Sequence, residues 1–150
     1  FTDNGKLPLK KYWYFNDMYS DSDSEKKSNI NGIIYSKEIN YWREKVVNNE
    51  PLGYKETELN KLMFKYSDKI KNKSMAVIGT ITPWIESISY EIGSSKIITL
   101  DYTRKRYEDP KLVWVHVNDY LDEIIKNRQF ESVDNAASYS SLEHAGLGKY

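Results

Sequence analysis

The sequence predicts an α/β fold built on a parallel sheet, and three observations in residues 75–101 lead to that prediction. Residues 75–78 (MAVI) are a short apolar run that stops at Gly79, which is typical of a buried strand and its turn. A helical pattern follows, and residues 96–100 then form a second β-rich run that ends at an acid, Asp101. Strand, glycine turn, helix, strand and acid is the order of the nucleotide-binding half of a Rossmann-like βαβ unit.

The segment between the two runs carries the start and stop signals of a helix. Thr82 is a good N-cap residue, and Pro83 is favoured at the first helical position because its missing N–H would be unpaired there anyway. Gly93 stands where a C-cap glycine belongs. The apolar stripe of this helix comprises Trp84, Ile85, Ile88 and Ile92. Because a crossover helix must cover the sheet, Trp84 and Ile88 are expected to share one buried core with Val77 and Trp114.

Each part of this unit suits a nucleotide. A glycine turn lets the backbone approach a ligand, the helix N-terminus offers free N–H groups, and a carboxylate can accept hydrogen bonds from two ribose hydroxyls. The expected gap from turn to acid is about 20 residues, and Asp101 follows Gly79 by 22. The G-x-G-x-x-G motif is absent, since residues 80–82 read Thr-Ile-Thr. The alternative is an ordinary βαβ crossover with an exposed aspartate.

Composition narrows the class of protein. The chain has 150 residues, one domain's worth or slightly less, with 39% hydrophobic and 29% charged residues, which suits a soluble globular domain with the cytoplasm as default compartment. The 22 basic and 22 acidic residues give a formal net charge of zero, so bulk charge does not favour nucleic acid. The absence of cysteine excludes disulfides and thiol catalysis. No apolar run approaches the roughly 20 residues of a membrane helix.

Residues 1–74 are expected to pack on the core as a loop and a pair of helices. Residues 20–31 are polar and predict a loop. Ser36 can cap a helix over residues 37–48, and residues 56–70 predict a second helix; this pair could cover a ligand mouth. The predicted buried faces are Ile39, Trp42 and Val46 in the first helix, and Leu59, Leu62, Met63, Tyr66 and Ile70 in the second.

Residues 102–109 (YTRKRYED) predict a charged loop. Its three basic residues could hold a phosphate or an acidic substrate, although a solvated surface explains them as well. A third strand is expected over residues 112–117, with His116 as a core histidine; two histidines so placed give no metal-ligand spacing, and no metal site is predicted.

A last helix and a last strand complete the predicted sheet. Asn118 can cap a helix over residues 119–127. Its inward-facing side chains are expected to be Leu121, Ile124 and Ile125. A fourth strand is expected near residues 132–138, which are small but include Asp134 and Asn135.

The stretch after that strand, YSSLEHAGLGKY at residues 139–150, carries a family resemblance. It resembles the "LEH" segment after the fourth strand of class I S-adenosylmethionine-dependent methyltransferases. It is closer still to a small methyltransferase-like family known only as a domain of unknown function. The resemblance covers residues 75–150 well and the preceding helices more loosely. In that family a G-D-P-L-N-P-like segment normally follows, and a class I fold has seven strands where this sequence predicts four.

The resemblance implies a role for each matching position. Cofactor-binding roles fall to Gly79, Thr80 and Thr82 at the cofactor's amino-acid end, Asp101 at the ribose, Asn118 or Asp119 at the adenine amino group, and residues from Ser140 to His144 at the mouth between cofactor and acceptor. From the residues alone, Glu143 and His144 can form a general-base pair that removes a proton from the acceptor. They can equally cap and position the next helix.

The prediction is therefore an α/β, Rossmann-like parallel sheet with strand order 3-2-1-4, helices on both faces and an N-terminal helical pair. Residues 75–150 would be an incomplete methyltransferase-type core, truncated after the fourth strand. The expected function is S-adenosylmethionine-dependent methyl transfer to an unknown small-molecule acceptor, with no nucleic-acid or membrane partner. Two alternatives stay open: a non-catalytic Rossmann-like binding module, and a sugar- or nucleotide-processing enzyme that uses Glu143 and His144.

Overall fold

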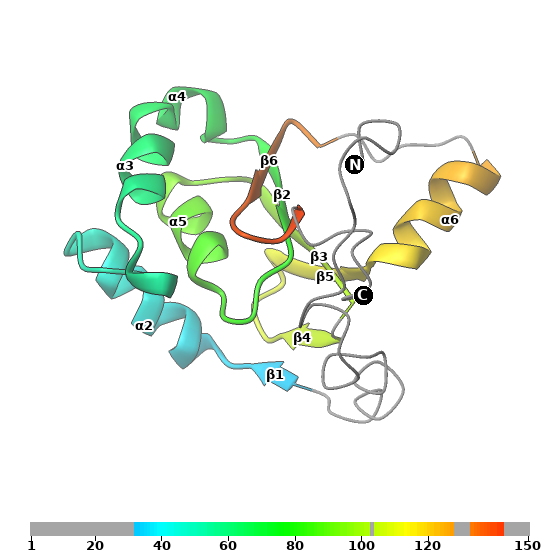
Figure 1. Cartoon of the computed structure of the whole chain (residues 1–150), viewed down its shortest axis with the longest axis horizontal. Helices are drawn as coiled ribbons and strands as arrows, with labels where there is room; N and C mark the ends of the chain where they lie inside the picture. The colour runs from blue at the N-terminus through cyan, green and yellow to red at the C-terminus, as the bar shows by residue number, and fades with distance from the viewer. Residues whose placement is uncertain (1–31, 103, 128–132, 143–150) are drawn as a thin grey trace, which may run out of the picture.

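A four-stranded parallel sheet forms the centre of the molecule (Figure 1). The computed structural model of the chain describes residues 32–102, 104–127 and 133–142. The strands lie in the order β5 (Leu112–His116), β3 (Lys96–Asp101), β2 (Ser74–Ile78) and β6 (Asn135–Ser138), and every pairing is parallel. The predicted order 3-2-1-4 and the predicted α/β class are confirmed, although β6 begins later than expected.

The strand order contains a reversal of direction. From β2 the chain adds β3 and then β5 on one side, whereas β6 returns to the other side of β2. In open α/β sheets this topological switch point is where a crevice opens at the carboxyl ends of the strands. Here the switch point lies between β2 and β6.

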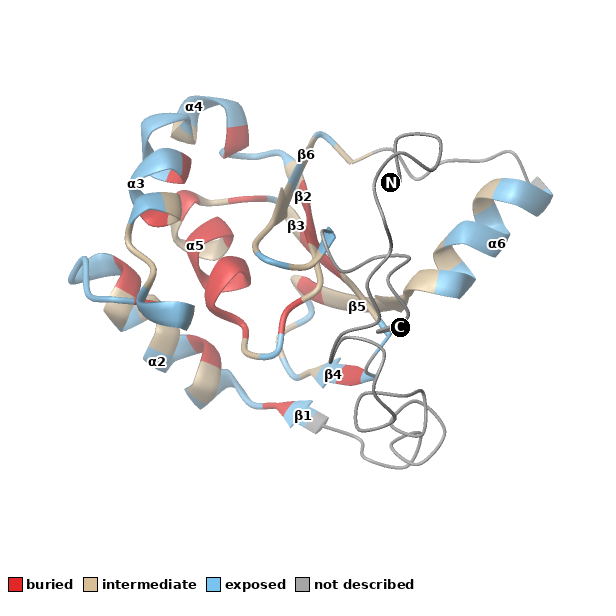
Figure 2. Cartoon of the chain, viewed as in Figure 1, coloured by how far each residue is buried: buried red, intermediate tan, exposed pale blue. Residues whose placement is uncertain are grey.

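Helix α5 (Trp84–Ile92) covers one face of the sheet and is almost wholly buried (Figure 2). Its side chains Trp84 and Ile88 join Val77 of β2 in one core cluster, as predicted. Trp114 of β5 is only half-buried and falls outside that cluster, so this part of the prediction is wrong. The reason is its position on β5, an edge strand of this sheet.

The carboxyl end of α5 agrees with the prediction, whereas its amino end differs by one residue. Gly93 adopts the left-handed conformation, with φ of 93°, as a C-cap glycine should. At the other end the helix begins at Trp84, and Pro83 takes the cap position. Thr82 is not a side-chain cap. Its backbone carbonyl accepts a hydrogen bond from the Trp84 N–H instead.

The N-terminal helices pack over α5, on its far side from the sheet (Figure 1). They are α2 (Ser36–Val47), α3 (Glu58–Lys65) and α4 (Ser67–Ile70), with a 3₁₀ turn η3 (Gly53–Lys55) before α3. The single helix expected over residues 56–70 is wrong, because Tyr66 leaves the helical conformation with φ −107° and ψ 25°. Leu62 and Tyr66 are exposed, and Asn60 is buried in that stripe, where its amide donates to the Val46 carbonyl.

A two-stranded parallel sheet was not predicted. It pairs β1 (Gly32–Ile34) with β4 (Lys105–Tyr107), and β4 lies within the segment expected to be a charged loop. The short β4 places Lys105 on the inside and Arg106 on the outside, following the alternation of a strand. This small sheet carries Lys105 and Tyr107 toward the main sheet.

Helix α6 (Val117–Asn127) lies on the opposite side of the sheet from α5 and projects away from it (Figure 1). Asn118 therefore lies inside the helix and is not the N-cap that the sequence predicted. Its N–H donates a hydrogen bond to Nδ1 of His116. Leu121 is 46% and Ile125 is 74% exposed, so the prediction that they face inward is wrong. Because α6 extends from the end of β5, most of its length passes beyond the sheet.

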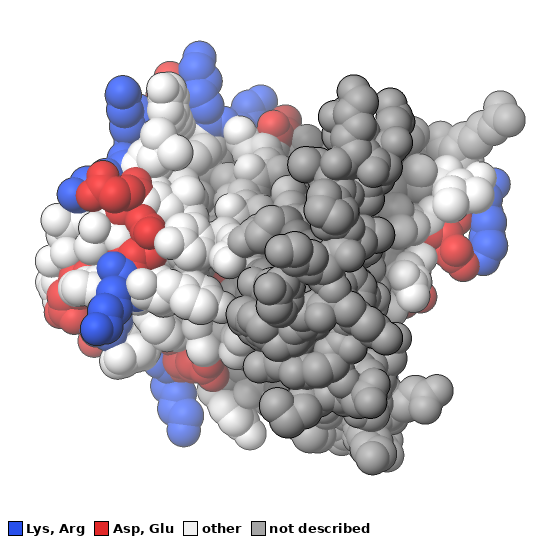
Figure 3. All heavy atoms as spheres, in the orientation of Figure 1, with Lys and Arg blue, Asp and Glu red and all other residues white. Residues whose placement is uncertain are grey.

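The described surface mixes charges of both signs. On the face shown in Figure 3, acidic and basic side chains are interspersed over the region of α2 to α4 and also occur on α6. Among the described residues, no helix is both long enough and apolar enough to cross a membrane.

Candidate functional site

Residues of the predicted site follow the four strands of the main sheet. Gly79 comes directly after β2, Asp101 is the last residue of β3, and Asn118 and Ser140 come two residues after β5 and β6. Because all four strands are parallel, these residues lie together along the carboxyl ends of the strands. This part of the sheet is the rim. Asn118 and Asp119 are exposed in the first turn of α6. Glu143 and His144 lie outside the described residues.

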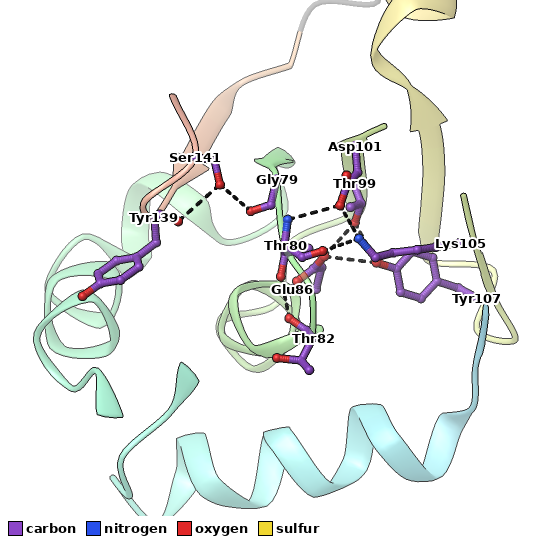
Figure 4. Close-up of polar contacts among 10 residues, drawn as sticks. All are labelled: Gly79, Thr80, Thr82, Glu86, Thr99, Asp101, Lys105, Tyr107, Tyr139 and Ser141. Carbon is purple, nitrogen blue, oxygen red and sulfur yellow. Dashed lines mark hydrogen bonds and ion pairs between the residues drawn. The ribbon is translucent and has the colours of Figure 1, made fainter. Parts of the chain in front are cut away.

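Gly79 is required by the backbone and by its neighbour. Its φ is +65°, which favours glycine, and its N–H donates to the Leu100 carbonyl at 2.9 Å. Ser141, beyond β6, donates its hydroxyl to the Gly79 carbonyl at 2.9 Å (Figure 4). A Cβ at Gly79 would lie 2.5 Å from the Ser141 Oγ. The close approach that this glycine allows is thus made by Ser141, across the switch point.

Thr80 uses all of its polar groups within the chain. Its N–H donates to Oδ2 of Asp101 at 3.4 Å, and its hydroxyl donates to the Thr82 carbonyl. Its carbonyl accepts a hydrogen bond from Nζ of Lys105. The turn after β2 is consequently fixed to the end of β3 by contacts that need no ligand.

Asp101 and Lys105 form a buried ion pair at the rim. Nζ of Lys105 contacts Oδ2 of Asp101, and the two side chains are 12% and 7% exposed for the acid and the base. The sequence predicted Lys105 to lie in a charged loop, solvated or holding an anion, which is wrong. Arg104 and Arg106 are exposed as a solvated loop would require. The alternation of strand β4 places Lys105 and Tyr107 on one face, but its three residues carry no apolar period that would have identified a strand in the sequence.

A second polar cluster lies beneath this pair, between α5 and the sheet (Figure 4). Glu86 of α5 is fully buried, and its Oε1 accepts hydrogen bonds from the Thr99 hydroxyl at 2.8 Å and the Tyr107 hydroxyl at 3.1 Å. The two hydroxyl oxygens are 2.9 Å apart. Oε2 of Glu86 is buried without a hydrogen-bond partner among the described residues.

Burial shifts the pKa of two groups in this cluster. It raises the pKa of the Glu86 carboxyl, while hydrogen bonds from Thr99 and Tyr107 and the nearby Lys105 cation oppose the rise. Burial also raises the pKa of Tyr107, and the Glu86 carboxyl adds to that rise. Lys105 is in direct contact with Asp101 rather than with Glu86, and the raised pKa of Glu86 favours its neutral form.

The segment after β6 also contacts the N-terminal part of the chain. The Tyr139 hydroxyl donates to Oε2 of Glu56 at 2.8 Å, and its ring packs edge-on against Trp84 with centroids 5.4 Å apart. An open hollow of about 540 Å³ lies beside Tyr139. Its other lining residues come from α3 and the residues before it: Glu56, Glu58, Leu59, Lys61, Leu62 and Lys65.

Comparison with protein families gives one match. A family described as "Caenorhabditis protein of unknown function, DUF268" matches residues 72–150, which is more than half of the chain. The chain belongs to the DUF268 family. Comparison with curated proteins gave no match, and comparison with solved structures also gave none.

The DUF268 region contains the whole main sheet together with α5 and α6. It also contains the ion pair of Asp101 and Lys105 at the rim and the cluster around Glu86 beneath that pair. Strand β1 and helices α2, α3 and α4 precede the matched residues. The candidate site is therefore a feature of the DUF268 region, whereas the N-terminal helices that pack on α5 lie outside the matched residues.

Proposed function

We propose that this DUF268 chain is an S-adenosylmethionine-dependent methyltransferase-like protein that acts on a small-molecule acceptor. The observation that carries the proposal is the meeting of the Gly79 turn and the Asp101 carboxylate beside the β2–β6 switch point. This is the position at which open α/β sheets bind nucleotide-type ligands. The resemblance of residues 139–150 to a methyltransferase-like family supports the choice of cofactor.

The donor set at the rim suits the nucleoside half of that cofactor. A carboxylate such as Asp101 accepts hydrogen bonds from ribose hydroxyls, and it is held at the end of β3 by Thr80 and Lys105. Asn118 and Asp119 offer exposed polar groups next to the end of β5 for an adenine amino group. The cofactor, when bound, supplies an electrophilic methyl group.

The chain's own residues would bind and orient. Gly79, Thr80 and Thr82 form the turn that the cofactor's amino-acid end would face, and Ser140 belongs to the segment on the other side of the switch point. Because Ser141 fills the space next to Gly79, entry of a ligand there requires this segment to shift. Glu143 and His144 stay predicted as the pair that removes a proton from the acceptor.

Calorimetric titration with S-adenosylhomocysteine tests the proposal. The unaltered 150-residue chain is expected to bind it, and Asp101→Asn is expected to weaken binding by about 1.5–3 kcal/mol, the usual loss for hydrogen bonds to a charged group. Asp122→Asn, on the exposed part of α6, is the matched control and is expected to bind normally. Circular dichroism confirms that each variant is folded.

Two results would contradict the proposal. Absence of binding by the unaltered chain removes the cofactor from consideration, and equal binding by the folded Asp101→Asn variant moves the ribose contact elsewhere. Binding without methyl transfer to any of a panel of small hydroxyl and amine acceptors would favour the non-catalytic binding module. Release of S-adenosylhomocysteine from S-adenosylmethionine in that panel would support an enzyme.

A further inference from the structure

Lys105 is an unusual residue for the interior of this domain. Its side chain is 7% exposed, while its neighbours Arg104 and Arg106 are exposed. Burying an ammonium group is costly unless the group is paired and hydrogen-bonded. The fold therefore holds Lys105 in place through specific contacts.

Those contacts join the two segments that form the rim. Nζ of Lys105 contacts the Thr80 carbonyl, in the turn after β2, and Oδ2 of Asp101, at the end of β3 (Figure 4). The Thr80 N–H reaches the same Oδ2 at 3.4 Å. One lysine thus fixes the direction of the Asp101 carboxylate and the path of the turn together.

The backbone that carries Lys105 is itself held from two sides. Strand β4 pairs with β1, and Lys105 lies opposite Gly32 in that pairing. Two residues along, the Tyr107 hydroxyl lies 2.9 Å from the Thr99 hydroxyl and donates to Oε1 of the buried Glu86. These contacts leave the lysine little freedom, which is what a group that positions another group requires.

We propose that Lys105 is a positioning residue that aims the Asp101 carboxylate at the ribose hydroxyls and so sets a preference for ribose over 2′-deoxyribose. The inference rests on the proposed function, since it concerns the same nucleoside site. In this role Lys105 acts on the ligand through Asp101 and Thr80, which it contacts. A lysine that merely stabilised the fold would affect ribose and deoxyribose ligands alike.

The test compares two ligands on three proteins. S-adenosylhomocysteine and its 2′-deoxyribose analogue are titrated by calorimetry into the unaltered chain, Lys105→Met and Lys126→Met. Lys126 is the matched control because it also pairs with an aspartate four residues before it, Asp122, but on the exposed surface of α6. Thermal unfolding of each protein is measured in parallel.

The expected results follow from the value of a hydrogen bond to a charged group. The unaltered chain and Lys126→Met are expected to prefer the ribose ligand by about 10- to 100-fold. Lys105→Met is expected to reduce that preference to within about threefold, since a misaimed carboxylate loses most of the hydrogen bond. Its affinity for the deoxyribose ligand is expected to change much less.

Each other outcome overturns the inference in a distinguishable way. Equal loss of affinity for both ligands in Lys105→Met indicates a purely structural role, and tighter binding indicates that Lys105 competes for Asp101. If the unaltered chain shows no ribose preference, Asp101 does not hold the ribose. If it binds neither ligand, the proposed function fails and this role fails with it.

A second variant keeps the test valid if Lys105→Met does not fold. Lys105→Arg retains the cation but replaces a compact ammonium with a larger planar group, so it should move the carboxylate while preserving the pair. We expect it to fold and to reduce the ribose preference by at least about threefold, because the two cations are not interchangeable at an oriented contact. An unchanged preference in folded Lys105→Arg overturns the inference.

Discussion

Lys105 and Asp101 form an ion pair that is largely shielded from solvent, with side chains 7% and 12% exposed. They come from the consecutive strands β4 and β3, which belong to different sheets. A charge that is buried this far is tolerated because its partner is present, so the effects of removing the two charges are coupled. This relationship has consequences for stability that are independent of any ligand.

Removing one charge of this pair should cost more than removing both. Lys105→Met removes the cation that contacts the Asp101 carboxylate and is expected to lower the free energy of unfolding by about 3–5 kcal/mol. The double variant Asp101→Asn with Lys105→Met carries no charge at this position and is expected to lose clearly less. Urea denaturation measures each value.

The exposed pair Asp122 and Lys126 provides the control for this comparison. It is also an aspartate followed by a lysine four residues later, but its side chains are 61% and 68% exposed. Asp122→Asn and Lys126→Met should each change stability by less than about 1 kcal/mol, as exposed pairs do. If the Lys105 and Asp101 variants behave additively like this control, the buried pair has no special role.

Stability should also depend on pH through Glu86. Burial raises the pKa of this carboxyl above its value in the unfolded chain, so its protonated form is the one that the fold accommodates. The contribution of Glu86 to folding stability is fully present below the pKa of this carboxyl in the unfolded chain, near 4.5. It is lost as the pH rises toward the higher pKa of the folded chain. Glu86→Gln mimics the neutral form at every pH.

The stability of Glu86→Gln relative to the unaltered chain should therefore increase with pH. Between the unfolded and folded pKa the relative gain is expected to be about 1.4 kcal/mol per pH unit. Urea denaturation from pH 4 to pH 8 measures it. Glu44→Gln, on the exposed face of α2, is the control. A relative stability of Glu86→Gln that stays constant over this range would show that Glu86 ionises normally.

Helix α5 supplies a prediction about the core. Ile88 is fully buried against the sheet, so Ile88→Ala should cost about 2–5 kcal/mol of unfolding free energy. Ile81, which is 83% exposed in the turn before the helix, is the matched control, and Ile81→Ala should change stability by less than about 0.5 kcal/mol. A loss below about 0.5 kcal/mol for Ile88→Ala would mean that the buried face of α5 is assigned wrongly.

The main sheet could be predicted because its signals are local. Residues 75–78 are an apolar run and residues 96–100 a β-rich run. The stripe from Trp84 to Ile92, together with Gly93, identifies the helix between them. The small sheet of β1 and β4 could not be predicted in this way. Its strands have three residues each, and β4 reads Lys-Arg-Tyr, which carries no apolar period.

The positions of the candidate site residues could be predicted only at the carboxyl ends of the strands. Gly79, Asp101, Asn118 and Ser140 could be placed because each lies at or just after the end of a strand. The burial of Lys105 and Glu86 depends on contacts between distant segments, which no spacing in the sequence reveals. The exposure of α6 was missed for a related reason, since an amphipathic pattern is the same whether a helix lies on a sheet or projects from it.

The contact across the switch point gives the last prediction. Gly79 and Gly93 both have positive φ, 65° and 93°, so replacing either with alanine costs about 1–2 kcal/mol in backbone strain. A Cβ at Gly93 would meet only Lys71 Cγ at 3.6 Å, an ordinary contact, whereas a Cβ at Gly79 would lie 2.5 Å from Ser141 Oγ and 2.7 Å from its Cβ. Gly79→Ala should therefore destabilise the chain more than Gly93→Ala, and the excess should disappear when Gly79→Ala is combined with Ser141→Gly. Chemical denaturation of the unaltered chain, Gly79→Ala, Gly93→Ala and the double variant measures this excess. If Gly79→Ala costs no more than Gly93→Ala, the segment after β6 does not rest on the turn, and the two sides of the switch point are not held together by Ser141.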